Sequence, residues 1–263
     1  MAPPRKAVEL FLSLGVTTAL AGGGLSLVPE ALAQHQHLPV AAHDEGGEGG
    51  EGGESGVGAI SSEVDLLVVL AQMQGHLRIA QELLEQGNPK AAEPHTGHPV
   101  DELYGAVAPA LQRLGIDPFL ESLEALRQQV RLNPNPAAIK PKLIAAQQAI
   151  AKASEALPAK VRQDPQITLA VVRQLAAAAA TEYDGAEADG RIVEVIEYQD
   201  ARGFLLEAKQ FLSKAQAAMP TATQQLQAKM PIINAMLKAF PAAIAPGKAV
   251  LSSAQLQQLQ SQL

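Results

Sequence analysis

The densest group of side chains that could bind a metal ion lies within residues 93–102. His95 and His98 are three residues apart, and Asp101 and Glu102 follow within about one helical turn. Two imidazoles with one or two carboxylates are an ordinary ligand set for zinc, iron(II) or manganese. The spacing therefore favours a metal site, although helix capping by His98 and stabilisation of a helix start by the two acids would explain the same residues.

Side chains on two other expected helices could complete this site. His76 lies beside the apolar stripe of a helix expected at residues 62–86, so it should face the inside of a bundle. On a helix expected at residues 191–218, Glu194 and Glu197 continue a line of inward-facing positions, where a carboxylate needs a cation or several hydrogen-bond donors. Arginine and lysine side chains of the same helix are the alternative partners. We predict a site for a divalent transition metal, iron, zinc or copper, with ligands from His76, His95, His98, Asp101, Glu102, Glu194 and Glu197.

The first 33 residues have the pattern of an export signal. Two basic residues precede an apolar run over residues 10–28, and Ala31-Leu32-Ala33 is a small-x-small cleavage site. The alternative is an uncleaved membrane anchor, which three glycines inside the run disfavour. We therefore expect a periplasmic or secreted protein.

Residues 34–60 are expected to form a flexible tether. Glycine and glutamate dominate their second half and resist ordering, because glycine loses much entropy when fixed and like charges repel. Three histidines, His35, His37 and His43, could capture a metal ion here. A signal cut that leaves His35 as the first residue would also suit copper or nickel. Weak cation binding by the glutamates is a further alternative to a solvated linker.

Composition excludes several classes of function. The 263-residue chain has a formal net charge of −7, which disfavours nucleic-acid binding because phosphate backbones need positive partners. It has no cysteine, so disulfides, thiolate metal sites and cysteine catalysis are excluded. Neither Gly-x-Ser-x-Gly nor His-Glu-x-x-His occurs, and we expect that the protein is not an enzyme. Beyond the signal, no stretch is long and apolar enough to span a bilayer.

Helix-forming residues dominate and strand-like alternation is absent, so we expect an all-α fold. The arrangement expected is an up-and-down helical bundle with four long helices and shorter crossing helices. Asp117 and Asp164, each before a proline, are expected to cap two helices. Helices are placed by glycine and proline breaks at residues 62–86, 98–115, 117–133, 137–157, from 165 onward, 191–218 and 221–240, with residues 90–97 as a link.

These elements divide the chain into four expected parts. They are the signal at residues 1–33, the tether at 34–60, the bundle domain at 61–219, and a C-terminal helix with a weakly ordered tail at 220–263. The bundle is long enough to bury a core of its own.

Short motifs resemble those of exported bacterial proteins. Gly97-His98-Pro99-Val100-Asp101 resembles the Gly-x-His-x-x-Glu signature of the imelysin family, whose members are exported helical proteins tied to iron uptake and described by analogy as peptidases. The signal, the tether, Gly75-His76-Leu77 and residues 197–204 resemble uncharacterised exported bacterial proteins over most of the mature chain. The first resemblance implies a role in iron uptake, and the second implies no activity.

The favoured hypothesis is an exported periplasmic protein that binds a divalent transition metal for uptake, storage or delivery. The alternative is a non-catalytic interaction or structural module of the cell envelope, with a protein partner and incidental histidines. A hydrolase is the least favoured of the three hypotheses.

Overall fold

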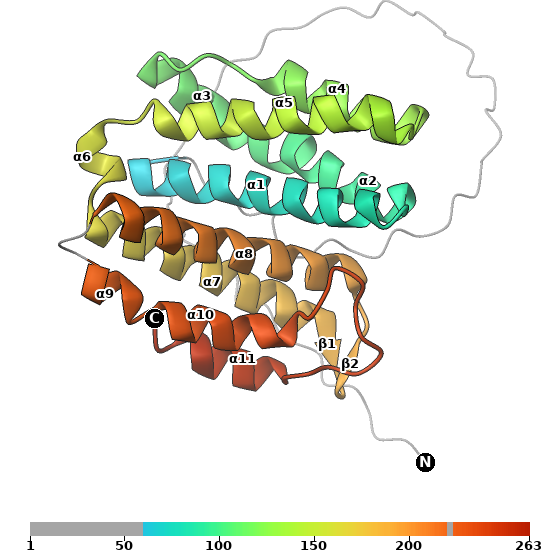
Figure 1. Cartoon of the computed structure of the whole chain (residues 1–263), viewed down its shortest axis with the longest axis vertical. Helices are drawn as coiled ribbons and strands as arrows, with labels where there is room; N and C mark the ends of the chain where they lie inside the picture. The colour runs from blue at the N-terminus through green and yellow to red at the C-terminus, as the bar shows by residue number, and fades with distance from the viewer. Residues whose placement is uncertain (1–59, 220–222) are drawn as a thin grey trace, which may run out of the picture. The chain divides into compact units, whose positions relative to one another are not determined.

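A computed structural model describes residues 60–219 and 223–263 (Figure 1). The predicted signal, residues 34–59 of the predicted tether and the histidines His35, His37 and His43 lie outside the described residues, so what we expect of them stays a prediction. Ile60, the last residue assigned to the tether, is buried against the core. Within the described ranges, no helix is long and apolar enough to cross a membrane.

Four long helices make up most of the described chain, and the all-α prediction is confirmed. They are α1 (Glu63–Glu85), α5 (Pro136–Glu155), α7 (Pro165–Ala186) and α8 (Val195–Ala218). Helix α1 packs against the other three and lies between α5 and α8, and α7 packs along α8 (Figure 1). The central position of α1 is reflected in its burial, because 14 of its 23 residues are buried.

Local capping explains why three of these helices begin where they were expected. Ser62 accepts a hydrogen bond from the Asp65 amide and Asp65 accepts one from the Ser62 amide, which forms a capping box at the start of α1. Asn135 caps α5 and Asp164 caps α7, each followed by a proline in the first turn. These side chains satisfy amides that have no partner inside the helix.

Residues 90–97, which were predicted to be a link, are helical. Helix α2 (Pro89–His98) leads through a π-helical turn, η1 (Pro99–Leu103), into α3 (Tyr104–Leu114). The prediction that a helix starts at His98 is therefore wrong. The physical reason is that Asn88 accepts a hydrogen bond from the Ala91 amide and caps a helix that begins nine residues earlier.

Two other predicted helix starts also differ. Helix α4 (Leu120–Leu132) follows Phe119 without a side-chain cap, so Asp117 is not its N-cap. Before α8, strands β1 (Glu187–Ala188) and β2 (Arg191–Ile192) form an antiparallel hairpin. Its two central residues have positive φ, 52° and 74°, as a two-residue hairpin turn requires, and α8 cannot begin until this turn is complete.

The C-terminal part is broken into shorter helices than predicted. These are α9 (Thr223–Gln227), α10 (Met230–Met236), the 3-10 turn η3 (Leu237–Ala239) and α11 (Ser253–Gln260). One further short helix, α6 (Ala159–Arg162), lies earlier in the chain, directly before α7. Proline at the second position of α10 explains the break, because proline fits the first turn of a helix and removes a backbone hydrogen bond in the interior. The tail packs more firmly than expected: Leu256 is fully buried, and Arg173 Nε donates to the Leu263 carbonyl at 2.7 Å.

Candidate metal centre

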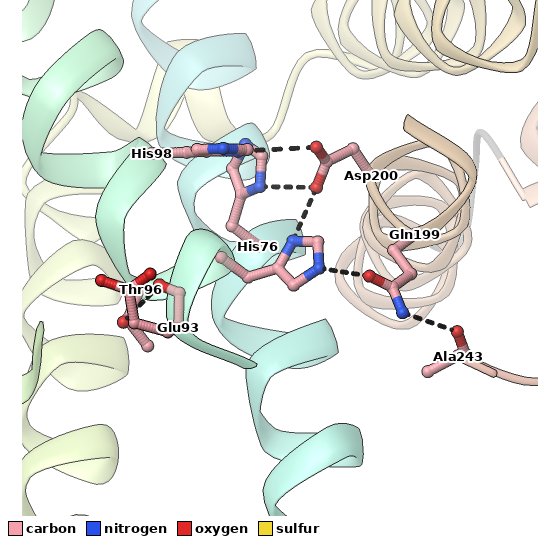
Figure 2. Close-up of polar contacts among 8 residues, drawn as sticks. His76, Glu93, Thr96, His98, Gln199, Asp200 and Ala243 are labelled. Carbon is pink, nitrogen blue, oxygen red and sulfur yellow. Dashed lines mark hydrogen bonds and ion pairs between the residues drawn. The ribbon is translucent and has the colours of Figure 1, made fainter. Parts of the chain in front are cut away.

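Three imidazoles from two helices meet one carboxylate from a third. His76 lies on α1, His95 and His98 lie on α2, and Asp200 lies on α8. Nδ1 of His76 and Nδ1 of His95 are each 2.8 Å from Asp200 Oδ1, and Nδ1 of His98 is 3.5 Å from Asp200 Oδ2. Figure 2 shows the Asp200 carboxylate facing His76 and His98. One ligand atom from each of the four residues lies within 4.8 Å of all the others.

All four side chains are removed from water. His76 and His95 are fully buried, His98 is 7% exposed and Asp200 is 3% exposed. Burying ionisable groups without partners is costly, so the cluster must be held together by hydrogen bonds, by ion pairs or by a shared cation.

Two glycines allow α1 and α8 to approach closely enough for His76 to reach Asp200. A Cβ atom at Gly203 would lie 2.7 Å from the Gly75 carbonyl oxygen, and one at Gly75 would lie 2.9 Å from the Gly203 carbonyl carbon. Both distances are below any ordinary contact of a Cβ atom, so only glycine fits at this crossing. Gly75 precedes His76 directly, and Gly203 lies about one turn after Asp200. The crossing therefore sets the distance between these two ligand candidates.

Helix α2 contributes His95 and His98 to the cluster. Their spacing of three residues places both on one face of the helix. The π-helical turn that follows begins at Pro99, directly after His98. Turns of this kind are uncommon and often occur at functional sites. Asp101 in this turn is bound by Arg127 of α4, with Nη1 2.7 Å from Oδ1, which joins η1 to α4.

The charges inside the cluster favour the ionised form of Asp200 and the protonated form of His98. Burial, the largest single influence, raises the pKa of Asp200, but His76 and His95 outweigh it and bring that pKa well below its ordinary value. Burial is also the largest influence on His98 and lowers its pKa. The hydrogen bond to Asp200 and the negative charges of Asp200 and Glu102 nevertheless raise the pKa of His98 above its ordinary value. An ionised carboxylate can only accept a hydrogen bond, so Nδ1 of His95, which is hydrogen-bonded to Asp200 Oδ1 at 2.8 Å, must carry a proton.

Such a cluster can exchange its protons for a metal ion. Neutral imidazole nitrogens and carboxylate oxygens are ligands for zinc, iron and copper, and binding releases the protons that occupied the same lone pairs. The donor set therefore fits a divalent transition metal.

The structure brings together three of the seven predicted ligands, His76, His95 and His98. Asp101 lies outside the group, because it is bound to Arg127 and its side chain is 51% exposed. Glu102 is also outside, although its charge influences His98.

The two predicted glutamates of α8 are not part of the group within the described chain. Glu194 is exposed at the N-cap position of α8, so the prediction that it lies on an inward helical face is wrong; the hairpin before α8 takes the place of the expected first turn. Glu197 is half-buried in the first turn, and its Cγ lies 3.9 Å from the position of a Cβ at Gly185.

Asp200 and its neighbour Gln199 are not among the residues predicted from the sequence. The signal for Asp200 was a line along α8 with spacings of four, three and four, formed by Ile196, Asp200, Gly203 and Glu207. Asp200, Gly203 and Glu207 are all buried. A glycine between two acids on one helical line indicates a face that another helix approaches closely.

Comparison with known families adds a second observation. Residues 158–263 match the family described as the iron permease-associated 4-helix bundle domain. The match covers less than half of the chain and runs from just before α6 through α11, so it contains Asp200 but none of the three histidines. No curated protein and no solved structure matches the chain significantly.

The matched description, a 4-helix bundle domain, agrees with the all-α fold. The name of the matched family refers to an iron permease, whereas the resemblance to the imelysin family gains no support from the comparisons.

Proposed function

We propose that the protein binds one divalent transition metal ion at His76, His95, His98 and Asp200, and that it serves uptake or delivery of iron at the cell envelope. The observation that carries the proposal is the convergence of four buried ligand atoms from α1, α2 and α8. The predicted export signal supports a periplasmic or secreted location.

The ligand types bear on which metal is bound. Three imidazoles and one carboxylate accept iron(II), zinc and copper, and at equal concentration copper and zinc bind such sites more tightly than iron(II). The match of residues 158–263 to an iron permease-associated domain supports iron as the metal handled in the cell. Selection of iron would then depend on metal availability rather than on affinity.

The number and burial of the ligands support holding a metal rather than catalysis. Metal sites that catalyse reactions keep an open position for water or substrate, whereas four protein ligands in a buried group leave little room for one. The role that fits is therefore storage or transfer of the ion.

A specific observation favours a second candidate function. Two imidazole nitrogens lie 2.8 Å from Asp200 Oδ1, which is a hydrogen-bond distance. In this candidate the cluster is a polar joint that locks α1, α2 and α8 together, and the protein is a non-catalytic structural or interaction module of the envelope.

Metal analysis of the purified exported protein separates the two functions. We expect about one equivalent of metal bound at the buried site, and loss of that equivalent in Asp200→Asn. The matched control is Asp101→Asn, which changes an acid of the same region that lies outside the group and should leave the metal content unchanged. A second control replaces His35, His37 and His43 by alanine, so that binding near the N-terminus is counted separately.

Two results would favour the polar joint over the metal site. One is the absence of bound metal in a preparation that also fails to take up iron(II) or zinc in titration. The other is equal uptake by the wild type and by Asp200→Asn.

A further inference from the structure

Gln199 lies directly behind one of the proposed ligands. Its Oε1 is 2.8 Å from Nε2 of His95, and its Nε2 donates to the Ala243 carbonyl oxygen at 3.0 Å. Gln199 is only 3% exposed, and His95 and Ala243 are fully buried. Figure 2 shows the Gln199 side chain between the cluster and the backbone at Ala243.

These two contacts fix the orientation of the amide and of the imidazole. The Ala243 carbonyl can only accept a hydrogen bond, so the NH₂ group of Gln199 must face it. The Gln199 oxygen then faces His95, and because an amide oxygen can only accept, Nε2 of His95 must carry a proton. The nitrogen that remains for a metal ion is Nδ1, the atom that lies 2.8 Å from Asp200.

We infer that Gln199 is the positioning residue of the metal site: it selects Nδ1 of His95 as the ligand atom and anchors this ligand, through Ala243, to the chain that follows η3. The inference rests on the proposed function and names how one ligand of that site is held. Ligating histidines generally donate their second ring N–H to a fixed acceptor, and losing that acceptor lowers metal affinity by about 10–100-fold.

The neighbouring side chains supply a matched control. Tyr198 donates its hydroxyl to the Ala242 carbonyl at 2.9 Å, and Arg202 donates to the Phe240 carbonyl at 2.5 Å. Three side chains of α8 therefore bind residues 240–243, but in the contacts described only Gln199 also binds a ligand candidate. If Gln199 only anchored residues 240–243, Tyr198 would have the same role. Only Gln199 can orient His95, because only Gln199 contacts its Nε2.

The test measures zinc affinity by competition with a chelator for the wild type, Gln199→Leu, Gln199→Glu and Tyr198→Phe. We expect Gln199→Leu to bind zinc about 10–100-fold more weakly. Gln199→Glu keeps an oxygen acceptor for Nε2 of His95 but loses the donor to the Ala243 carbonyl, so its affinity should lie between those of Gln199→Leu and the wild type. Tyr198→Phe should change the affinity by less than about threefold, since it leaves the acceptor of His95 in place.

A spectroscopic measurement adds a readout that a structural role would not change. Long-range ¹H–¹⁵N spectra of the zinc-loaded wild type should show a metal-bound Nδ1 and a protonated Nε2 at His95. In the metal-free protein, the Nε2 proton of His95 should be protected from exchange in the wild type and in Tyr198→Phe, and unprotected in Gln199→Leu.

Each contrary result has a defined meaning. Zinc on Nε2 of His95, equal affinities of the wild type and Gln199→Leu, or an equal loss in Tyr198→Phe would overturn the role of Gln199 while leaving the metal site intact. A wild type that binds no zinc at all would overturn the proposed function, and this inference with it.

Discussion

Asp200 is the residue on which the cluster depends, because its carboxylate is within 3.5 Å of a nitrogen of each histidine. It neutralises charge that would otherwise be buried alone, and it supplies the only carboxylate of the four-residue group. Removing one partner of a buried charged group is strongly destabilising, since the remaining charge is left uncompensated. The histidines and the carboxylate therefore stabilise each other even before a metal ion binds.

The raised pKa of His98 predicts a pH dependence in the metal-free protein. A folded-state pKa above the unfolded value of about 6.5 means that His98 contributes stability that is fully present below that pH. The contribution is lost as the pH rises through the raised pKa. We expect the free energy of unfolding of the metal-free protein to fall as the pH rises above about 6.5, with a shallower fall in His98→Gln.

The measurement is denaturant unfolding at several pH values with chelator present. With zinc at saturation the trend should reverse, because the ion competes with protons and binds more tightly at higher pH. Parallel pH profiles for wild type and His98→Gln, with and without zinc, would show that the His98 imidazole does not titrate as part of this cluster.

At the scale of the helices, the crossing of α1 and α8 at Gly75 and Gly203 determines the site. We predict that Gly203→Ala forces the two helices apart, because its Cβ would lie 2.7 Å from the Gly75 carbonyl oxygen. The expected effects are a loss of about 1–3 kcal/mol in the free energy of unfolding and a weaker metal affinity. Thermal unfolding and zinc titration of the same samples measure both.

Gly105→Ala is the matched control, since Gly105 also lies in a helix but has open space where a Cβ would be. Its stability should be unchanged or higher by up to about 1 kcal/mol, because alanine loses less entropy in a helix than glycine. Equal behaviour of the two alanine variants would contradict the close crossing.

Helices could be predicted from the sequence wherever a local signal determined them. The apolar stripe and capping box of α1, and the caps of α5 and α7 that are each followed by a proline, require no knowledge of distant residues. The hairpin before α8 was missed although Asp189-Gly190 is a known two-residue turn signal, because its strands are only two residues long. The start of α2 was missed because Pro94 and two histidines resemble a link rather than a helix.

The candidate site was predicted only in part for the same reason. His95 and His98 are close in sequence, and His76 lies on a buried face, so local patterns indicated all three. Asp200 approaches them only through the crossing at two glycines more than 120 residues apart in sequence, which no periodicity within one helix reveals. The role of Gln199 could not be predicted either, because the orientation of its amide depends on a hydrogen bond to the Ala243 carbonyl, which is distant in sequence.

At the scale of the whole molecule, the site joins the part of the sequence that matches a known family with a part that lies outside that match. The part matching the iron permease-associated domain supplies Asp200 and Gln199, and residues 60–157 supply the three histidines. Metal binding is therefore expected to stabilise the packing of α1 and α2 against α8, rather than either part alone.

This arrangement predicts that metal raises the stability of the whole described fold. A ligand at a free concentration of 100 times its Kd stabilises the folded state by about 2.7 kcal/mol, which corresponds to a rise in Tm of roughly 5–11 °C for a chain of this size. Calorimetry with and without zinc measures the change. Asp200→Asn should show no such rise, and an equal rise in that variant would place the stabilising ion elsewhere.

The most direct test of the account is an anomalous difference map from crystals of the full-length protein grown with one equivalent of zinc or, without oxygen, iron(II). The account predicts one strong peak within bonding distance of Nδ1 of His95 and a carboxylate oxygen of Asp200, with His76 and His98 completing the coordination. A cluster without a peak in crystals that contain bound metal, or a single peak at another position, would contradict it.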